Sequence, residues 1–78
     1  MKAKVLVRLK SGVLDPQGKA VLHAAQSLGF EGIQEVRVGK VFEVQLDSEN
    51  AESARKTLEE LSDKLLANTV IEDFEVQI

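Results

Sequence analysis

The sequence predicts an α+β fold whose six elements follow one another in the order β-α-β-β-α-β. Two kinds of periodicity indicate this order. Apolar and polar residues alternate in some parts of the chain, as in half-buried strands, and apolar residues recur every three or four positions in others, as in amphipathic helices. With 78 residues the chain has room for one thin core, so we expect a single domain over residues 1–78.

The first half of the chain contains a strand, a helix and a pair of strands. Alternation in residues 3–9 (AKVLVRL) predicts a strand with one buried face, and Leu6 is an apolar exception on the charged face. Residues 16–28 have helical spacing, and Gly29 is placed to end that helix. Residues 32–47 (GIQEVRVGKVFEVQLD) predict two short strands.

The second half supplies the remaining helix and strand. Residues 51–67 (AESARKTLEELSDKLLA) have apolar positions in steps of three and four, and Asp47, Ser48 or Asn50 can cap the helix. Residues 70–78 (VIEDFEVQI) alternate again. The natural closure of this order is a ferredoxin-like fold, in which a four-stranded antiparallel sheet carries two helices on one face.

The pair of strands around Gly39–Lys40 carries a register prediction. A two-residue turn there would place Val38 opposite Val41, which mixes the buried and exposed faces. Three connecting residues or a bulge would match the faces instead. The pairs would then be Val38 with Phe42, Val36 with Val44, and Arg37 with Glu43 as an opposite-charge pair.

Composition excludes several classes of function. The chain has no cysteine, which removes disulfides, thiolate metal sites and a cysteine nucleophile. Its formal charge is −3 and its only aromatic residues are three phenylalanines, which disfavours binding to nucleic acid. The apolar runs are too short to span a membrane and we see no signal peptide, so we expect a cytoplasmic location.

The segment SGVLDPQGKAV, residues 11–21, can be interpreted in two ways. Backbone N–H groups at the start of a helix can bind a phosphate. Alternatively, Gly12 makes the turn, Asp15 caps the helix and Pro16 takes its first position. The segment matches neither of the glycine-rich phosphate motifs, and a capping carboxylate competes with an incoming anion, so the residues favour the cap.

No group of residues indicates catalysis or metal binding. His23 is the only histidine and has no second ligand type nearby in the sequence, whereas zinc requires three or four ligands. The carboxylates belong to helix surfaces and the outer face of the sheet, where no cleft would shift their pKa. The open face of the sheet, with its mixed charges, suits either solvent or a polar protein interface, and the last strand has an edge that can pair with another chain. We therefore expect no catalytic residue and no metal site, and interpret the chain as a small scaffold that binds protein.

Three blocks of the sequence, LKSGVLDPQGKAV, EVRVGKVFEVQL and KLLANTVIEDFEV, together resemble the PurS family. This is the family of the small subunit of phosphoribosylformylglycinamidine synthase in purine biosynthesis. The resemblance covers essentially the whole chain, and the blocks occur in family order and spacing. Thr69 departs from the family, which often has proline after LAN, and this affects only the stiffness of the entry to the last strand.

The resemblance implies a non-catalytic subunit without a cofactor of its own. The enzyme converts formylglycinamide ribonucleotide to its amidine with ammonia released from glutamine by a glutaminase subunit. A large synthetase subunit, with ATP and Mg²⁺, uses that ammonia. The family's small subunit is a homo-oligomer, a dimer or a tetramer, and it bridges the other two subunits.

The residues that keep the family motif without an obvious core role are the expected partner contacts. They are Gly12, Asp15, Arg37, Lys40, Asn68, Glu72 and Asp73. The expected oligomer interface contains Leu6, Phe74 and Val76. A different interpretation also stands, because the same order of elements occurs in dimeric regulatory domains. Such a domain would bind an amino acid or another small ligand near Gly12–Asp15.

Overall fold

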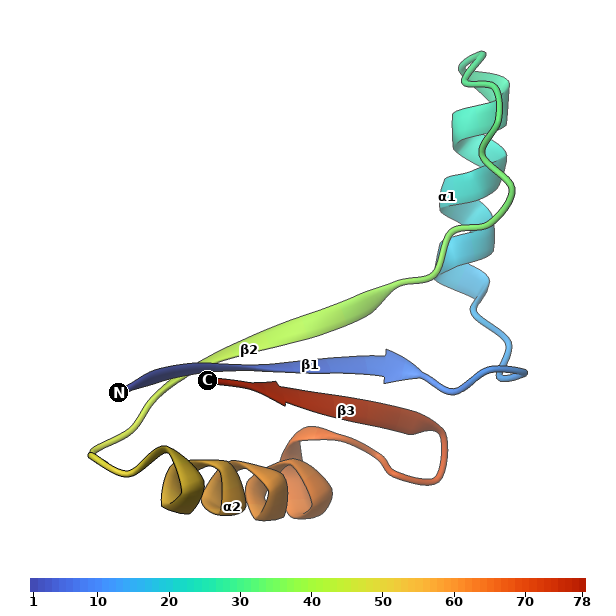
Figure 1. The fold of residues 1–78 in the computed structure, drawn as a ribbon. Helices are drawn as coiled ribbons and strands as arrows, with labels where there is room; N and C mark the ends of the chain where they lie inside the picture. The colour runs from blue at the N-terminus through green and yellow to red at the C-terminus, as the bar shows by residue number, and fades with distance from the viewer.

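The computed structural model describes residues 1–78, and its elements run in the order β1, α1, β2, α2, η1, β3 (Figure 1). The strands are β1 (Lys2–Leu9), β2 (Gly39–Gln45) and β3 (Glu72–Gln77). The helices are α1 (Pro16–Ser27), α2 (Ala51–Leu61) and the π-helical turn η1 (Ser62–Leu66) that continues α2. No helix is long and apolar enough to cross a membrane.

The sheet has three antiparallel strands in the order β2-β1-β3, so the prediction of a four-stranded sheet is wrong. Val5 in the central strand lies opposite Phe42 on one side and Val76 on the other. Residues 33–38, the expected fourth strand, pair with no strand of the chain. The expected hairpin at Gly39–Lys40 is therefore absent, and the chain runs from residue 33 into β2 without reversing direction (Figure 1).

The core lies between the sheet and α2. Its buried members come from β1, β3, α2 and the turn after η1: Ala3, Val5, Val7, Leu58, Ala67 and Val76. Half-buried side chains from β2 and its continuation, Phe42, Val44 and Leu46, pack against this cluster. The spacing of Ala54 and Leu58 turns one face of α2 towards the sheet, as the sequence predicts. Ser62 is fully buried, and its hydroxyl donates to the carbonyl of Leu58 at 2.7 Å.

Helix α1 does not cover the sheet, so the prediction of two helices on one face is wrong for this helix. In Figure 1, α1 and the segment that returns from it project away from the three strands. The Cα radius of gyration is 15.9 Å and the longest extent is 48 Å. A compact domain of this length would have a radius of about 11–12 Å. We call residues 16–38, which leave the body of the molecule in this way, the arm.

The helix ends follow the sequence closely. Asp15 is the N-cap of α1 and Pro16 its first residue, and the chain leaves the helix through Gly29 at a φ of +90°. Asn50 is the N-cap of α2, where its side-chain oxygen accepts from the N–H groups of Glu52 and Ser53. The capping predictions for both helices are confirmed, with Asn50 chosen among the three candidates.

Candidate functional site

Asp15 joins three segments at the base of the arm. Its Oδ1 accepts from the N–H of Gly18 at 2.8 Å, which caps α1, and its Oδ2 accepts from the N–H of Val38 at 2.7 Å. The side chain is buried although it is charged. These bonds from Val38 and Gly18 lower the pKa of the Asp15 carboxyl, helped by the nearby Arg37 guanidinium and opposed by burial. The carboxylate therefore stays ionised and holds the end of the return segment against the start of α1.

Two further residues complete this junction, which we call the joint (Asp15, Gly18, Arg37 and Val38). Arg37 donates from Nη2 to the carbonyls of Lys10 and Val13, at 3.2 and 3.0 Å, and its Nε lies 4.0 Å from Asp15 Oδ2. Gly18 is buried where a Cβ would collide with the carbonyl oxygen of Val36. The joint explains the missing hairpin, because residues 36–38 are fixed to the base of α1 and cannot fold back on β2.

The joint also decides between the two interpretations of residues 11–21. The Asp15 carboxylate occupies the N-terminus of α1, where a phosphate would have to bind. Gly12, at a φ of +88°, makes the turn that leads from β1 to the cap. The interpretation as turn and cap is confirmed.

A second polar cluster lies in the turn before β3. The N–H of Asn68 donates to Glu72 Oε1 at 2.7 Å, and the Asn68 side chain accepts from the N–H of Val70 at 3.2 Å. The Asn68 carbonyl in turn accepts from the N–H of Glu72 at 2.7 Å. Lys40 Nζ lies 3.8 Å from Glu72 Oε2 and 5.8 Å from the centre of the Phe42 ring. This cluster fixes the shape of the turn and ties it to the start of β2.

The two clusters lie at the same end of the sheet. The N–H of Lys10 donates to the carbonyl of Ile71 at 2.8 Å, while its own carbonyl accepts from Arg37. The expected partner contacts therefore gather in one region, although they are far apart in the sequence. Asp15 is buried and Arg37, Asn68 and Glu72 have partners within the chain, whereas the exposed Asp73, opposite Arg8 in the register, has no ion pair.

The three residues expected at the oligomer interface lie on opposite faces of the sheet. Leu6 is half-buried on the face that no helix covers. That uncovered face also carries Lys4, Arg8, Val41, Glu43 and Glu75. Val76 is buried in the core and Phe74 packs against it. The side chains of Phe74 and Val76 are thus engaged within the chain, and on the outer edge of β3 the Val76 carbonyl accepts from Arg55 Nη1 at 3.1 Å.

The surface offers hollows rather than an enclosed reaction site. One of them, about 620 Å³, lies at the end of the sheet where the termini meet, and its ionisable side chains are Lys2, Lys4 and Glu43. A smaller hollow of about 390 Å³ lies beside the joint. No three His, Asp or Glu side chains are close enough together to hold a metal ion. Such a surface can bind another molecule.

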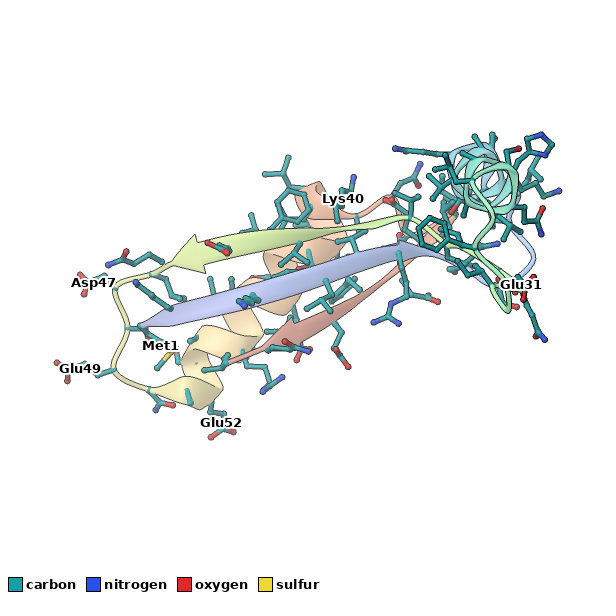
Figure 2. The ribbon with its side chains drawn as sticks, turned by 90° about the horizontal axis from the view of Figure 1, so that it is seen from above. Met1, Glu31, Lys40, Asp47, Glu49 and Glu52 are labelled. Atoms are coloured by element: carbon teal, nitrogen blue, oxygen red, sulfur yellow. The ribbon has the colours of Figure 1, made fainter.

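Sequence reasoning missed one feature, the apolar surface of the arm. Its exposed side chains are Val21, Leu28, Phe30 and Ile33, which range from 37% to 76% exposed. Figure 2, which looks down the arm, shows its side chains clustered near Glu31 beyond the end of the strands. The helical spacing of Val21 and Leu28 was interpreted as contact with the chain's own sheet. Periodicity identifies an apolar face but does not say which chain covers it.

The chain is similar to known proteins both in sequence and in fold. The family model PurS, described as phosphoribosylformylglycinamidine (FGAM) synthase, matches residues 2–78. The PurS subunit of Bacillus subtilis is 44% identical over 77 residues, which is 99% of this chain and 90% of that protein. The crystal structure of Methanocaldococcus jannaschii PurS, 41% identical, matches 97% of this chain and 92% of that one with a TM-score of 0.89.

A structure of PurLQS from Thermotoga maritima contains a chain of the same shape. That chain is 28% identical, and the match covers 97% of this chain and 93% of that one with a TM-score of 0.89.

Proposed function

The chain belongs to the PurS family, and from this premise we propose that it works as a non-catalytic bridge within phosphoribosylformylglycinamidine synthase. It is a PurS subunit of that synthase, which acts in purine biosynthesis. The observation that carries this assignment is the family match over residues 2–78. The relative from T. maritima is described within PurLQS, and we infer that this chain enters a complex of the same kind.

The proposed role is to hold a glutaminase subunit and a large synthetase subunit in a fixed relation. Ammonia released from glutamine is small and is lost to water or protonated unless the two active sites are kept together. A chain that brings no nucleophile and base together can contribute by position alone. We assign ATP and Mg²⁺ to the synthetase subunit, assign no cofactor to this chain and place the complex in the cytoplasm.

We also propose that the chain acts as a homo-oligomer, with a dimer as its smallest unit. Its exposed apolar arm supports this, because monomeric proteins rarely leave such a large apolar surface in water. The alternative role, a sensor of an amino acid, is not favoured. Such a ligand was expected near Gly12–Asp15, and the family match over residues 2–78 supports the PurS role instead.

Reconstitution tests the bridging role. The glutaminase and synthetase subunits are mixed with and without this chain, and product is followed with glutamine or with ammonium as nitrogen source. We expect glutamine-driven turnover to require the chain and ammonium-driven turnover to need it far less. Full glutamine-driven turnover without the chain would overturn the proposal.

The contact region can be tested through Asp73, an exposed carboxylate without an ion pair in the chain. We propose that the sheet end formed by the joint and the Asn68–Glu72 turn meets one of the two partners. Asp73→Asn removes the charge without placing a like charge opposite Arg8, and it should lower glutamine-driven turnover several-fold with little change in melting temperature. Glu59→Gln, on the exposed surface of α2, is the matched control. Equal effects of the two substitutions would count against this region.

A further inference from the structure

One face of the sheet has no layer of the chain's own over it. In Figure 1, α2 lies along one side of the three strands, and no helix lies over the strands on the other side. That uncovered face carries alternate residues of each strand, and all of its ionisable side chains are exposed. A sheet with helices on both of its faces is a stable layer arrangement, so a helix from another chain would complete one here.

The charges of the uncovered face are separated by strand. Its cations lie on the central strand β1 and its carboxylates on the outer strands β2 and β3. They are Lys2, Lys4 and Arg8, and Glu43, Asp73 and Glu75. Lys4 lies opposite Glu43 in the register, and Arg8 lies opposite Asp73. None of the six side chains forms an ion pair within the chain, so all of them are available to charged groups of another molecule.

Two apolar side chains lie at the centre of this face. Leu6 on β1 is half-buried and lies opposite Val41 on β2, which is 56% exposed. The surface is hollowed on both sides of this pair. The hollow of about 620 Å³ lies towards the termini, and one of about 380 Å³ lies towards the joint. An apolar centre within a charged rim is the usual anatomy of a protein interface.

We propose that a helix of one partner subunit lies along β1 on the uncovered face. This helix carries a stripe of acidic residues over the cations of β1, basic residues on either side of the stripe, and an apolar side chain against Leu6 and Val41. The inference rests on the proposed bridging role and names the surface that receives one of the two partners. From Lys2 to Arg8 the strand is about 20 Å long, a length that about four helical turns span.

Charge complementarity selects this occupant. A helix with its side chains is about 10 Å wide and neighbouring strands lie about 4.8 Å apart, so the two sides of the helix would reach Glu43 and Glu75. Basic residues beside the acidic stripe would meet these carboxylates. Two sheets that pack face to face keep their strands nearly aligned, so a second copy centred on β1 would instead set cations against cations.

The uncovered face is continuous with the contact region proposed at the end of the sheet. Asp73, which tests that region, lies on this face opposite Arg8. A partner that meets the sheet end can therefore extend along β1 without a gap, and we assign both surfaces to the same partner subunit.

A single cysteine on this face tests the occupant. The chain has no cysteine, so Glu75→Cys introduces one thiol on β3 to which a photoreactive cross-linker can be attached. In a mixture with the glutaminase and synthetase subunits, we expect a cross-link to an acidic helix of one of them, located by mass spectrometry. Lys56→Cys, exposed on α2, should give no cross-link to that helix. A cross-link to a second copy alone, or no cross-link at all, would overturn the proposal.

Removal of the central charges provides the second test. Lys4→Gln combined with Arg8→Gln should raise the dissociation constant for the partner subunits about tenfold and weaken its dependence on salt concentration. The melting temperature should stay unchanged, because both side chains are exposed and neither has an ion pair. Lys56→Gln combined with Lys64→Gln removes the same charge from α2 and should leave the dissociation constant as it is.

An unchanged dissociation constant in the Lys4→Gln and Arg8→Gln variant would also overturn the proposal. Glutamine-driven turnover in the reconstituted complex reports separately on the bridging role. If that turnover requires the chain while Glu75→Cys gives no cross-link, the bridging role stands and only the assignment of this face is wrong.

Discussion

A single buried carboxylate, that of Asp15, sets the direction of the arm. Each of its two oxygens accepts a different hydrogen bond. One accepts from the Gly18 N–H and caps α1, and the other accepts from the Val38 N–H and holds the segment that leads into β2. An asparagine side chain could accept only one of these two hydrogen bonds, because its nitrogen would lie against the other N–H donor. At the scale of the residue, the fold of the arm depends on this charge being present.

Asp15→Asn should lower the melting temperature at neutral pH by about 5 °C, the usual result of losing one cap-like hydrogen bond in a small domain. The pKa of Asp15 is lowered below its ordinary value of 3.8 in the folded chain, mainly by the bonds from Val38 and Gly18. A lowered pKa means that the carboxylate stabilises the fold above pH 3.8 and that this is lost as pH falls through the folded value. Melting curves from pH 7 downward should therefore show the two proteins converging only in strong acid, and a constant difference at every pH would contradict this.

Gly18→Ala should lower the free energy of unfolding, whereas the same substitution in most helices raises it. Within a helix, alanine normally stabilises by about 0.5–1 kcal/mol relative to glycine. Here the added Cβ would collide with the Val36 carbonyl, and such overpacking costs about 1–3 kcal/mol. Denaturant unfolding measures the difference, and Gln17→Ala on the exposed side of the same turn is the control. A more stable Gly18→Ala protein would show that the Val36 carbonyl can move aside and that residues 36–38 are not held firmly against α1.

At the scale of the element, α1 has two different faces. Gly18, Leu22 and Ala25 turn towards the returning segment, and Val21 and Leu28 point away from it. A helix with apolar residues on both sides must be covered on both sides. The chain covers only one of them, which is why the stability of α1 should depend on a second copy.

The double substitution Val21→Ser and Leu28→Ser tests this dependence. In an isolated chain these side chains are 47% and 76% exposed, so polar replacements should change stability by less than about 0.5 kcal/mol. If a second copy covers them, the loss should be about 2 kcal/mol, measured by denaturant unfolding at high protein concentration. Val70→Ser, 82% exposed in the turn before β3, is the control and should be nearly neutral. A neutral double variant would exclude burial of this face.

Most of these elements could be predicted from the sequence, but the path of the segment between α1 and β2 could not. Alternation and helical spacing located β1, β2, β3, α1 and α2, and the capping residues located the starts of both helices, because these signals are local. The path of residues 33–38 could not be predicted, since it depends on contacts of Asp15 and Gly18 with residues about twenty positions away. The expected partner contacts were predicted as separate segments, and only the fold shows that they share one end of the sheet.

At the scale of the whole molecule, stability and association are linked. The body has a small core of six buried apolar residues, and the arm adds apolar surface without burying it. A small domain of this kind gains stability by assembling with copies of itself. Its folding should therefore be measured together with its oligomeric state.

The melting temperature should rise with protein concentration. When a dimer unfolds to two separate chains, a higher protein concentration favours the folded dimer. Each tenfold increase stabilises it by the free energy that corresponds to a tenfold change in an equilibrium constant. With the usual unfolding enthalpy per residue, two chains of 78 residues should melt about 5 °C higher for each tenfold increase. Calorimetry between micromolar and millimolar concentrations measures this slope. A melting temperature that does not change with concentration would mean that the arm is stable without a partner. The apolar surface of α1 would then need a different explanation.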